Sequence, residues 1–201
     1  IPLPIQCIYY LYPMVKAGQY NKLKVVRKAD FGFYLDDGAE GILLPNRFVP
    51  KNLNIGDEIE VLVYHDSEDR LIATTQKPLG IVGDIVKLKT VSTTPQGAFL
   101  DWGLMKDLFV AKSQQLTGMR TQGEYLVKIY RDEKTGRVAA SEKFDSSLSN
   151  DQLTVKVLDE VDLIVYRRTN IGYVVIINNQ HTGVLHHNEI YRTISVGDNF
   201  K

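Results

Sequence analysis

Cysteine is almost absent from this sequence: Cys7 is the single one among 201 residues, so no disulfide can form within the chain. Chains without disulfides are typical of a reducing compartment, and we therefore expect a cytoplasmic protein. Long hydrophobic runs are also missing. The first thirteen residues, IPLPIQCIYYLYP, carry no charge, but they are shorter than the roughly 20 residues that span a membrane, and their three prolines oppose a helix. We expect no membrane contact and an irregular N-terminal extension over residues 1–17.

The chain also has no excess of charge of either sign, since 24 lysines and arginines balance 24 aspartates and glutamates. A neutral chain lacks the strong positive field of a typical duplex-DNA-binding protein, although it can still carry a local basic stripe. No phosphate-binding loop and no nucleophile motif occurs, so we expect neither an enzyme nor a cofactor. The histidines near Glu189 lack the spacing of a metal site and no cysteine accompanies them, so we expect no bound metal.

What the sequence does contain is a motif that occurs three times. When Gly32, Gly97 and Gly172 are superimposed, the segments VRKADFGFYLD, VSTTPQGAFLD and YRRTNIGYVVI align without gaps, at spacings of 65 and 75 residues. Two further blocks follow each glycine in the same order. Such long periods indicate three small domains, each with its own core, instead of a solenoid. We expect these domains at residues 18–78, 79–146 and 147–201.

Each copy is rich in short segments in which apolar and polar residues alternate. Leu23 and Val25 alternate with lysines, and Ile59, Val61 and Val63 alternate with glutamates, which indicates strands with one buried face. About five such segments and a short helical piece fit into each copy. The sequence therefore predicts an all-β fold of tandem, small, five-stranded OB-type barrels, with an SH3-like barrel as the alternative.

The stretch ADFGFYLDDGAEGILLP resembles the hairpin between the second and third strands of the S1-type RNA-binding domain, which is an OB barrel. Three copies in a row, with IGYVVIINNQHTGVLHHNE in the third, look like the bacterial conserved virulence factor B family. The resemblance covers residues 18–201. It implies tandem S1-like domains that bind RNA, followed by a winged helix that does not occur in these 201 residues.

The resemblance also implies a binding site of stacking aromatic residues, a late aspartate–arginine pair and a histidine, which the copies keep unevenly. The positions kept are Phe31, Tyr34, Asp66 and Arg70 in the first copy, Phe99, Asp132 and Arg137 in the second, and His186 in the third. Leu44 and Val110 stand where the other two copies would carry the histidine. Since no copy is complete, we expect binding to depend on the copies acting together.

Cations accompany these aromatic residues. They are Arg27 and Lys28 in the first copy, Lys87 and Lys89 in the second, and Arg167 and Arg168 in the third. An exposed ring can stack an unpaired base and nearby cations can hold its phosphates, so the predicted ligand is single-stranded RNA. The predicted function is a non-catalytic RNA-binding protein that acts as a post-transcriptional regulator of gene expression. The alternative is a protein-interaction scaffold of OB barrels that binds no RNA.

Two further expectations concern the backbone. The motif glycine predicts a local kink that lets Phe31 and Tyr34 share one face, whereas Phe33 is expected in the core. The third copy stops four residues after Gly197, whereas the first continues 21 residues past Gly56. We therefore expect an incomplete third barrel, which a strand of a second copy could complete in a homodimer.

Overall fold

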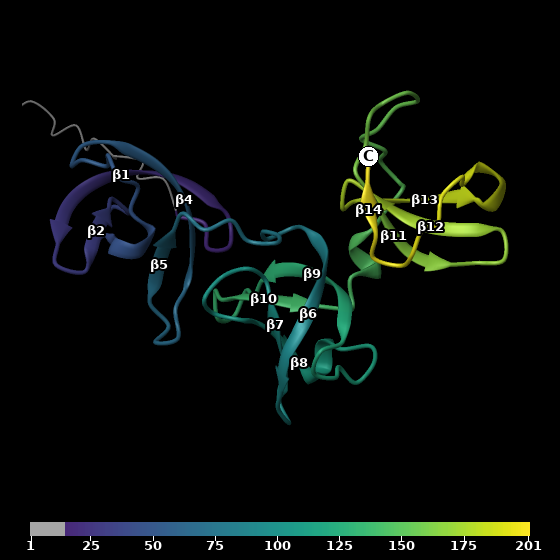
Figure 1. Cartoon of the computed structure of the whole chain (residues 1–201), viewed down its shortest axis with the longest axis horizontal. Helices are drawn as coiled ribbons and strands as arrows, with labels where there is room; N and C mark the ends of the chain where they lie inside the picture. The colour runs from purple at the N-terminus through teal and green to yellow at the C-terminus, as the bar shows by residue number, and fades with distance from the viewer. Residues whose placement is uncertain (1–14) are drawn as a thin grey trace, which may run out of the picture. The chain divides into compact units, whose positions relative to one another are not determined.

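The structure, a computed structural model, describes residues 15–201 and is almost entirely β (Figure 1). The expected N-terminal extension lies outside the described residues except for its last three positions. The chain divides into two compact units, Ile1–Gln76 and Lys77–Lys201. No helix in the described part of the chain has the length and apolar character needed to cross a membrane.

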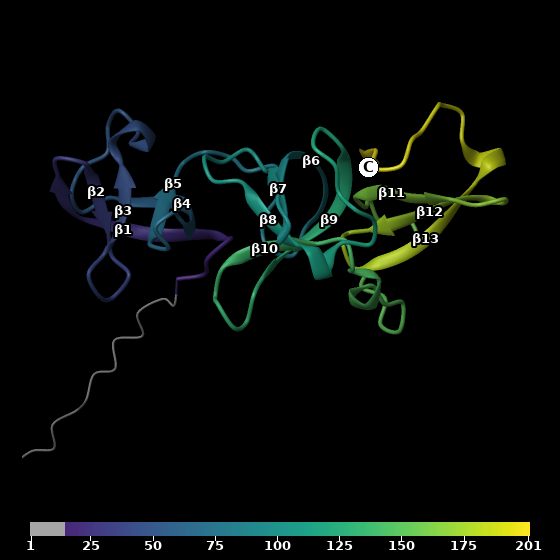
Figure 2. The same cartoon turned by 90° about the horizontal axis from the view of Figure 1, so that it is seen from below.

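The first unit is a closed five-stranded barrel, drawn in purple and blue in Figures 1 and 2. Its strands are β1 (Tyr20–Ala29), β2 (Gly32–Leu35), β3 (Ile42–Pro45), β4 (Glu58–His65) and β5 (Leu71–Thr74), with a short 3-10 helix, η1 (Asn46–Phe48), after β3. The strands follow the order β1-β2-β3-β5-β4, in which β3 and β5 run parallel and close the barrel. This is the OB-type barrel that the sequence predicts.

The core of the first barrel follows the predicted alternation. Leu23, Val25, Val61 and Val63 are all buried, while Lys22, Lys24, Glu58 and Glu60 are not; from Val61 to Tyr64, however, β4 is buried on both faces. Phe33 is buried among them, as expected for a core residue. The period-two pattern therefore identifies the inner face of β1 and of the first half of β4.

A β-bulge interrupts β1 between Val25 and Arg27, so that Arg27 lies opposite Tyr34 on β2. The same irregularity recurs in the other two repeats, between Thr90 and Ser92 and between Val165 and Arg167. The kink expected at the motif glycine is therefore found on the neighbouring strand, one residue before the basic pair.

The motif glycine serves a different purpose from the expected kink. A Cβ atom at Gly32 would overlap the backbone carbonyl of Leu44 on the facing strand. The equivalent atoms at Gly97 and Gly172 would overlap the carbonyls of Val110 and Leu185. Glycine is required because the two strands of the hairpin approach each other too closely for any side chain.

The second unit begins with a five-stranded sheet in the order β10-β9-β6-β7-β8. Its strands are β6 (Ile85–Thr93), β7 (Gly97–Asp101), β8 (Leu108–Ala111), β9 (Glu124–Arg131) and β10 (Val138–Ser141), with 3-10 helices η2 (Lys112–Gln114) and η3 (Asp145–Ser147). The edge strands β8 and β10 lie against each other, so this sheet curls into a nearly closed barrel. We call it the second barrel.

The third repeat forms a four-stranded sheet in the order β13-β12-β11-β14. Its strands are β11 (Leu163–Arg168), β12 (Gly172–Ile177), β13 (His181–His186) and β14 (Asn199–Phe200), with the 3-10 helix η4 (His187–Glu189) after β13. The expectation of an incomplete third barrel is confirmed, and we call this part the third sheet. Pairing of this sheet with a second copy of the chain stays a prediction.

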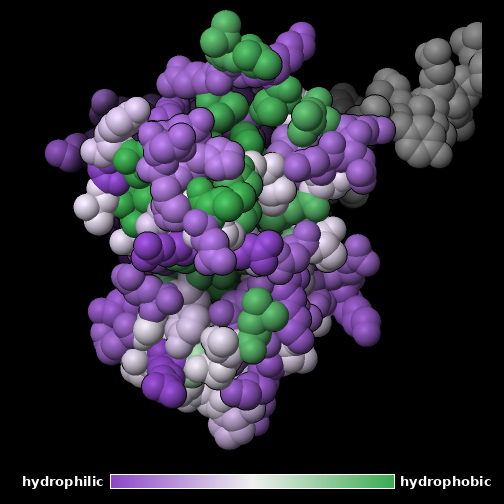
Figure 3. All heavy atoms as spheres, turned by 90° about the vertical axis from the view of Figure 1, so that its right-hand side faces the viewer, coloured by the Kyte–Doolittle hydropathy of each residue, from purple (hydrophilic) through white to green (hydrophobic). Residues whose placement is uncertain are grey.

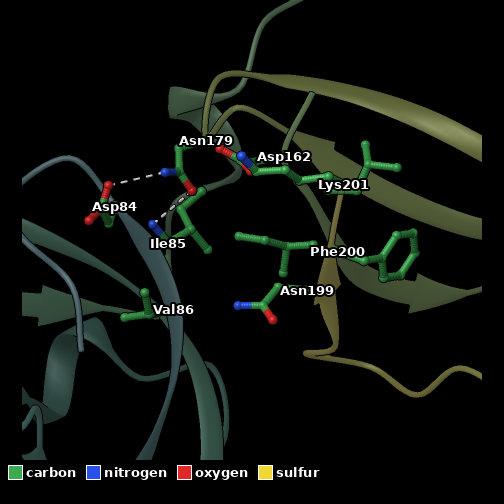
Figure 4. Close-up of a pocket in the computed structure, with 10 residues that line it drawn as sticks. Asp84, Ile85, Val86, Asp162, Asn179, Asn199, Phe200 and Lys201 are labelled. Carbon is green, nitrogen blue, oxygen red and sulfur yellow. Dashed lines mark hydrogen bonds between the residues drawn. The ribbon is translucent and has the colours of Figure 1, made fainter. Parts of the chain in front are cut away.

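The second barrel and the third sheet share contacts within their unit. Ile85, Phe144 and Ile176 form a buried apolar cluster. Asn179, at the tip of the β12–β13 hairpin, accepts a hydrogen bond from the backbone N–H of Ile85 at 3.0 Å and donates one to the carboxylate of Asp84 at 3.2 Å. Figure 4 shows these bonds at the rim of a cavity of about 380 Å³. The two repeats are therefore joined by both apolar and polar contacts.

The segment that leads into the third sheet is also bound to β13. The backbone N–H of Ser149 donates to the carbonyl of Gln180. The side-chain amide of Asn150 donates to the carbonyl of Thr182 and accepts from the N–H of Thr182. The buried ring of His181 contacts the carbonyl of Ser149 through Nδ1 at 2.6 Å and accepts from the N–H of Thr154 through Nε2 at 3.2 Å. The first part of the connection, from Ser149 to Thr154, is therefore held against the β12–β13 hairpin.

One turn of the third repeat departs from the other two. Leu158 is 99% exposed and has a φ of 76°, at the position that Gly18 (φ 79°) and Gly83 (φ 108°) occupy in the first and second repeats. In those repeats the glycine N–H bonds the carbonyl of Val63 or Ile129 in the barrel wall. Leucine is rare in this left-handed conformation, because its Cβ crowds the backbone.

Candidate nucleic-acid interface

The most exposed aromatic residue of the first barrel is Phe31, at the turn between β1 and β2, with 75% of its surface accessible. The turn itself is fixed. The backbone N–H of Asn46 donates to the carbonyl of Phe31 at 3.0 Å, and the Asn46 side chain donates to the carbonyl of Asp30 at 2.7 Å. A rigid backbone thus holds a large apolar ring in water, where burial would normally be favoured.

Tyr34 lies on the outer side of β2, half-buried, with Leu43 of β3 opposite. The bulge in β1 places Arg27 across from Tyr34, and its guanidinium carbon lies 3.9 Å from the centre of the tyrosine ring. This is a close cation–π contact, which holds the positive charge beside the aromatic face. Lys28 lies further from the Phe33 ring, at 5.6 Å.

The late polar pair of the first barrel is a hydrogen-bonded ion pair. The Asp66 carboxylate accepts from Nε of Arg70 at 3.0 Å and from its Nη2 at 2.8 Å, and it also accepts from the backbone N–H groups of Glu68 and Arg70. Burial alone would raise the pKa of Asp66, but the hydrogen bonds from Arg70 outweigh it and hold the pKa below its ordinary value.

The second barrel carries an aromatic pair in place of Tyr34 and Leu43. Phe99 of β7 and Phe109 of β8 are directly opposite each other, with ring centres 5.1 Å apart and tilted by 47°. The residue across from Phe99 on β6 is Ser92, so no cation stacks there as Arg27 does on Tyr34. Of the pair, the sequence singles out Phe99 alone. Phe109 lies between Leu108 and Val110, which are both buried, so the alternation along β8 turns its ring to the outer face.

The other predicted residues of the second barrel lie on β6 and in the turn between β9 and β10. Asp132 accepts from the backbone and hydroxyl of Thr135, and these bonds lower its pKa. The backbone carbonyl of Arg137 accepts a hydrogen bond from the backbone N–H of Asp132 at 2.8 Å. Lys87 approaches Glu124 at 3.6 Å and lies against Gly197 of the third repeat, whereas Lys89 is exposed opposite Asp101.

In the third sheet, Arg167 and Arg168 are both exposed and pair with Val174 and Tyr173 on β12. The Tyr173 ring meets the His187 ring edge-on at 5.5 Å. Arg168 and His187, together with Thr169 and Asn170, line a hollow of about 490 Å³. The motif does not predict Tyr173 or His187 as site residues. Their rings meet because β12 pairs with β13, and this pairing cannot be read from the spacing in the sequence.

The strand register changes one alignment made from the sequence. His186 lies opposite Gly172, as Pro45 lies opposite Gly32 and Ala111 opposite Gly97. His186 is therefore equivalent to Pro45 and Ala111, and not to Leu44 and Val110. It is exposed, whereas Leu44 and Val110 are fully buried. The physical reason is that the hairpin loops differ in length, which sequence spacing alone does not correct for.

No cluster of three or more histidine, cysteine, aspartate or glutamate residues that could hold a metal occurs among residues 15–201. Hydrophobic residues on the side of the molecule that carries the third sheet are scattered among hydrophilic ones (Figure 3). The aromatic and cationic outer face of the first barrel is therefore the best-defined candidate site in the described chain.

The barrel topology and this outer face define a domain class. Residues 17–76, the whole of the first barrel, match the family model of the S1 domain. The chain is similar to "Uncharacterized protein YitL" of Bacillus subtilis (strain 168), at 35% identity over 98 residues. This match covers 48% of the chain and 33% of the relative, so it spans about a third of the length of that protein.

A solved structure supports the fold over a longer range. It is a multidomain protein with nucleic acid binding domains from Streptococcus pneumoniae TIGR4, which covers 92% of this chain and 67% of its own, with a TM-score of 0.56 and 16% identity. At this identity the likeness is one of fold. It agrees with a tandem arrangement of OB-type barrels.

Proposed function

We propose that the chain binds single-stranded RNA, without catalysis, through the outer face of its first barrel. The observation that carries this proposal is the Phe31 ring, which is held 75% exposed on a fixed turn next to the strand that bears the Arg27–Tyr34 stack. Exposed aromatic rings stack unpaired bases of any sequence, and neighbouring cations neutralise the phosphates. Duplex nucleic acid does not offer such bases, because they are already paired and stacked.

The S1 match of residues 17–76 and the OB topology support this function, because OB barrels bind oligonucleotides on this kind of surface. The Streptococcus pneumoniae protein is described by its title as carrying nucleic acid binding domains. S1-type barrels are binding modules, which supports a non-catalytic role. The second barrel and the third sheet would contribute binding residues of their own, Phe99 in the former and Arg167 and Arg168 in the latter.

The wider biological role rests on the three-fold repeat. We propose that residues 18–78, 79–146 and 147–201 act as tandem binding domains of a cytoplasmic post-transcriptional regulator, as in the conserved virulence factor B family. The remaining positions of the implied site are part of the same proposal, namely Lys28, Asp66, Arg70, Lys87, Lys89, Asp132, Arg137 and His186. Deletion of the gene, followed by transcript half-life measurements, tests this role separately from RNA binding.

The test of RNA binding is the double variant Phe31→Leu/Tyr34→Leu, measured by fluorescence anisotropy with a labelled single-stranded oligoadenylate. Stacking contributes about 1–3 kcal/mol per base, so losing two rings should weaken binding at least about tenfold. Tyr191→Leu is the matched control, because Tyr191 is 95% exposed but lies outside this face, and it should leave the affinity unchanged. Unchanged affinity in the double variant, or tighter binding of duplex than of single strand, would overturn the proposal.

A further inference from the structure

A tight turn of one construction occurs four times among residues 15–201, at residues 54–57, 81–84, 156–159 and 195–198. In each, the last residue is an aspartate whose backbone N–H donates to the carbonyl of the first residue and whose carboxylate accepts from the N–H of that residue. The third residue always has a positive φ. It is glycine in three of the turns, Gly56, Gly83 and Gly197, and leucine in the fourth, Leu158.

The leucine at this position is strained and gains no burial in return. Its φ of 76° is unfavourable for a residue with a Cβ atom, and its side chain is 99% exposed, beside Val157 at 91%. The exposure is a property of the turn. A Cβ atom on Gly83, the counterpart of Leu158 in the second repeat, or on Gly56 would meet no atom within 4 Å beyond its chain neighbours. Strain that no internal contact offsets points to a function outside the chain.

The loop that carries Leu158 is held at both ends. The backbone N–H of Thr154 donates to the buried His181 ring at 3.2 Å, and that of Asp162 donates to the Asn178 side chain at 2.9 Å. Both acceptors belong to the β12–β13 hairpin, and the turn bonds described above fix the tip of the loop. Figures 1 and 2 show this loop projecting from the third sheet. A loop that is already ordered loses little conformational entropy when its tip binds.

Negative charge surrounds the apolar tip. The single basic residue from position 151 to position 162 is Lys156. The acidic residues of the same segment are all exposed, namely Asp151, Asp159, Glu160 and Asp162. Such a collar repels nucleic acid phosphates and anionic lipid headgroups, and it attracts a surface that carries lysine or arginine.

We propose that residues 154–162 form a docking loop for a partner protein, which receives Val157 and Leu158 in an apolar pocket with a basic rim. The docking loop is a binding site separate from the aromatic face of the first barrel, and it does not depend on RNA binding. Burial of the leucine side chain alone favours such a complex about tenfold or more, and attraction between the collar and the basic rim adds to it at low salt.

The probe is a phage-displayed library of random peptides of about 12 residues, selected on the full chain. Enriched peptides should combine large apolar side chains with a net positive charge. Once synthesised, they should bind Leu158→Gly at least about tenfold more weakly than the wild type in fluorescence anisotropy. Circular dichroism should show this variant folded, because glycine is the residue of the other three turns. Ile55→Ala is the matched control, since Ile55 is 61% exposed in the turn at residues 54–57 and should not affect binding.

A second variant tests the charge. Glu160→Lys should weaken binding of the same peptides at low salt and have less effect at high salt, because screening removes the attraction in the wild type. Equal affinity of wild type and Leu158→Gly, enrichment of peptides without cationic residues, or no enrichment at all would overturn the proposal. So would Leu158-dependent cosedimentation with phosphatidylcholine vesicles, which would make the ligand a lipid surface. Oligoadenylate should bind wild type and Leu158→Gly alike, whichever way the peptide result falls.

Discussion

Thr90 marks a core position at which the second repeat has a polar residue and the other two repeats have valine. It occupies the place of Val25 in the first barrel and Val165 in the third sheet, and like them it is fully buried. Its hydroxyl oxygen makes no hydrogen bond within the described part of the chain. A buried hydroxyl without a partner costs stability, because it loses its hydrogen bonds to water on folding.

We predict that Thr90→Val stabilises the second barrel by about 1 kcal/mol, since valine has nearly the same shape and removes the unsatisfied group. Urea unfolding followed by Trp102 emission measures this, because Trp102 is buried in the same barrel and its indole N–H donates to the carbonyl of Lys106. The reverse change in the first barrel, Val25→Thr, should be destabilising and should leave the Trp102 transition unchanged. A lower urea midpoint for Thr90→Val would contradict this account.

Individual side chains were predictable from the sequence where a local pattern determines them. Phe33 was placed in the core because aromatic residues in strands are usually buried, and Asp66 and Arg70 were singled out together by the family resemblance and are hydrogen-bonded to each other in the structure. Phe109 was missed because its stacking partner, Phe99, is ten residues away and only strand pairing brings them together. His186 was misaligned for the same reason, because register depends on hairpin length.

At the scale of elements, the recurrent unit is a bulged strand followed by a hairpin whose first residue is glycine. The strands themselves follow from alternation, and the short 3-10 helices appear after β3, β8 and β13 as expected. The bulge was not predictable, because the residues inserted there, Val26, Val91 and Tyr166, share no composition that marks a bulge. The close approach of the hairpin strands at the glycine is likewise a property of pairing.

The role of this glycine gives a prediction for the second barrel. Gly97→Ala should destabilise it by about 3 kcal/mol, because the new methyl group would overlap the carbonyl of Val110 and the ring of Phe109. Gly118→Ala is the matched control, since the nearest atom to its Cβ is the Nζ of Lys112 at 3.8 Å and little should change. Urea midpoints from Trp102 emission compare the two. Equal midpoints would show that β8 can shift to make room.

At the scale of the whole molecule, the repeats are not used alike. The first is a closed barrel in a unit of its own, while the second and third share a buried cluster around Ile85, Phe144 and Ile176. The three similar sequence copies do not reveal that the second and third repeats share contacts. One such contact is the hydrogen bond that Tyr166, at the bulge position of the third copy, donates to Asp145, which precedes the strands of that copy. Burial and this bond raise the pKa of Tyr166 to about 12.

We predict that Asn179→Gly loosens the second unit without unfolding either part. Glycine keeps the left-handed backbone at this position (φ 59°) but removes the side chain that bonds Ile85 and Asp84. Nuclear magnetic relaxation should then show faster and less uniform tumbling of β11–β13 relative to β6–β9. Asn178→Gly is the control, since Asn178 bonds Asp162 within the third repeat. Identical relaxation in wild type and Asn179→Gly would mean that the apolar cluster alone fixes the contact.

The exposed turn at Leu158 has a consequence for limited proteolysis. Val157 and Leu158 offer a protease an accessible apolar site, whereas the residues on either side are anchored, Ser149 to Thr154 on β13 and β11 against the second barrel. A cut after Leu158 would therefore break the covalent chain without separating its pieces. The nicked protein should elute as one species under native conditions and yield two fragments in denaturant, which makes this turn a natural place to split the chain into complementing halves.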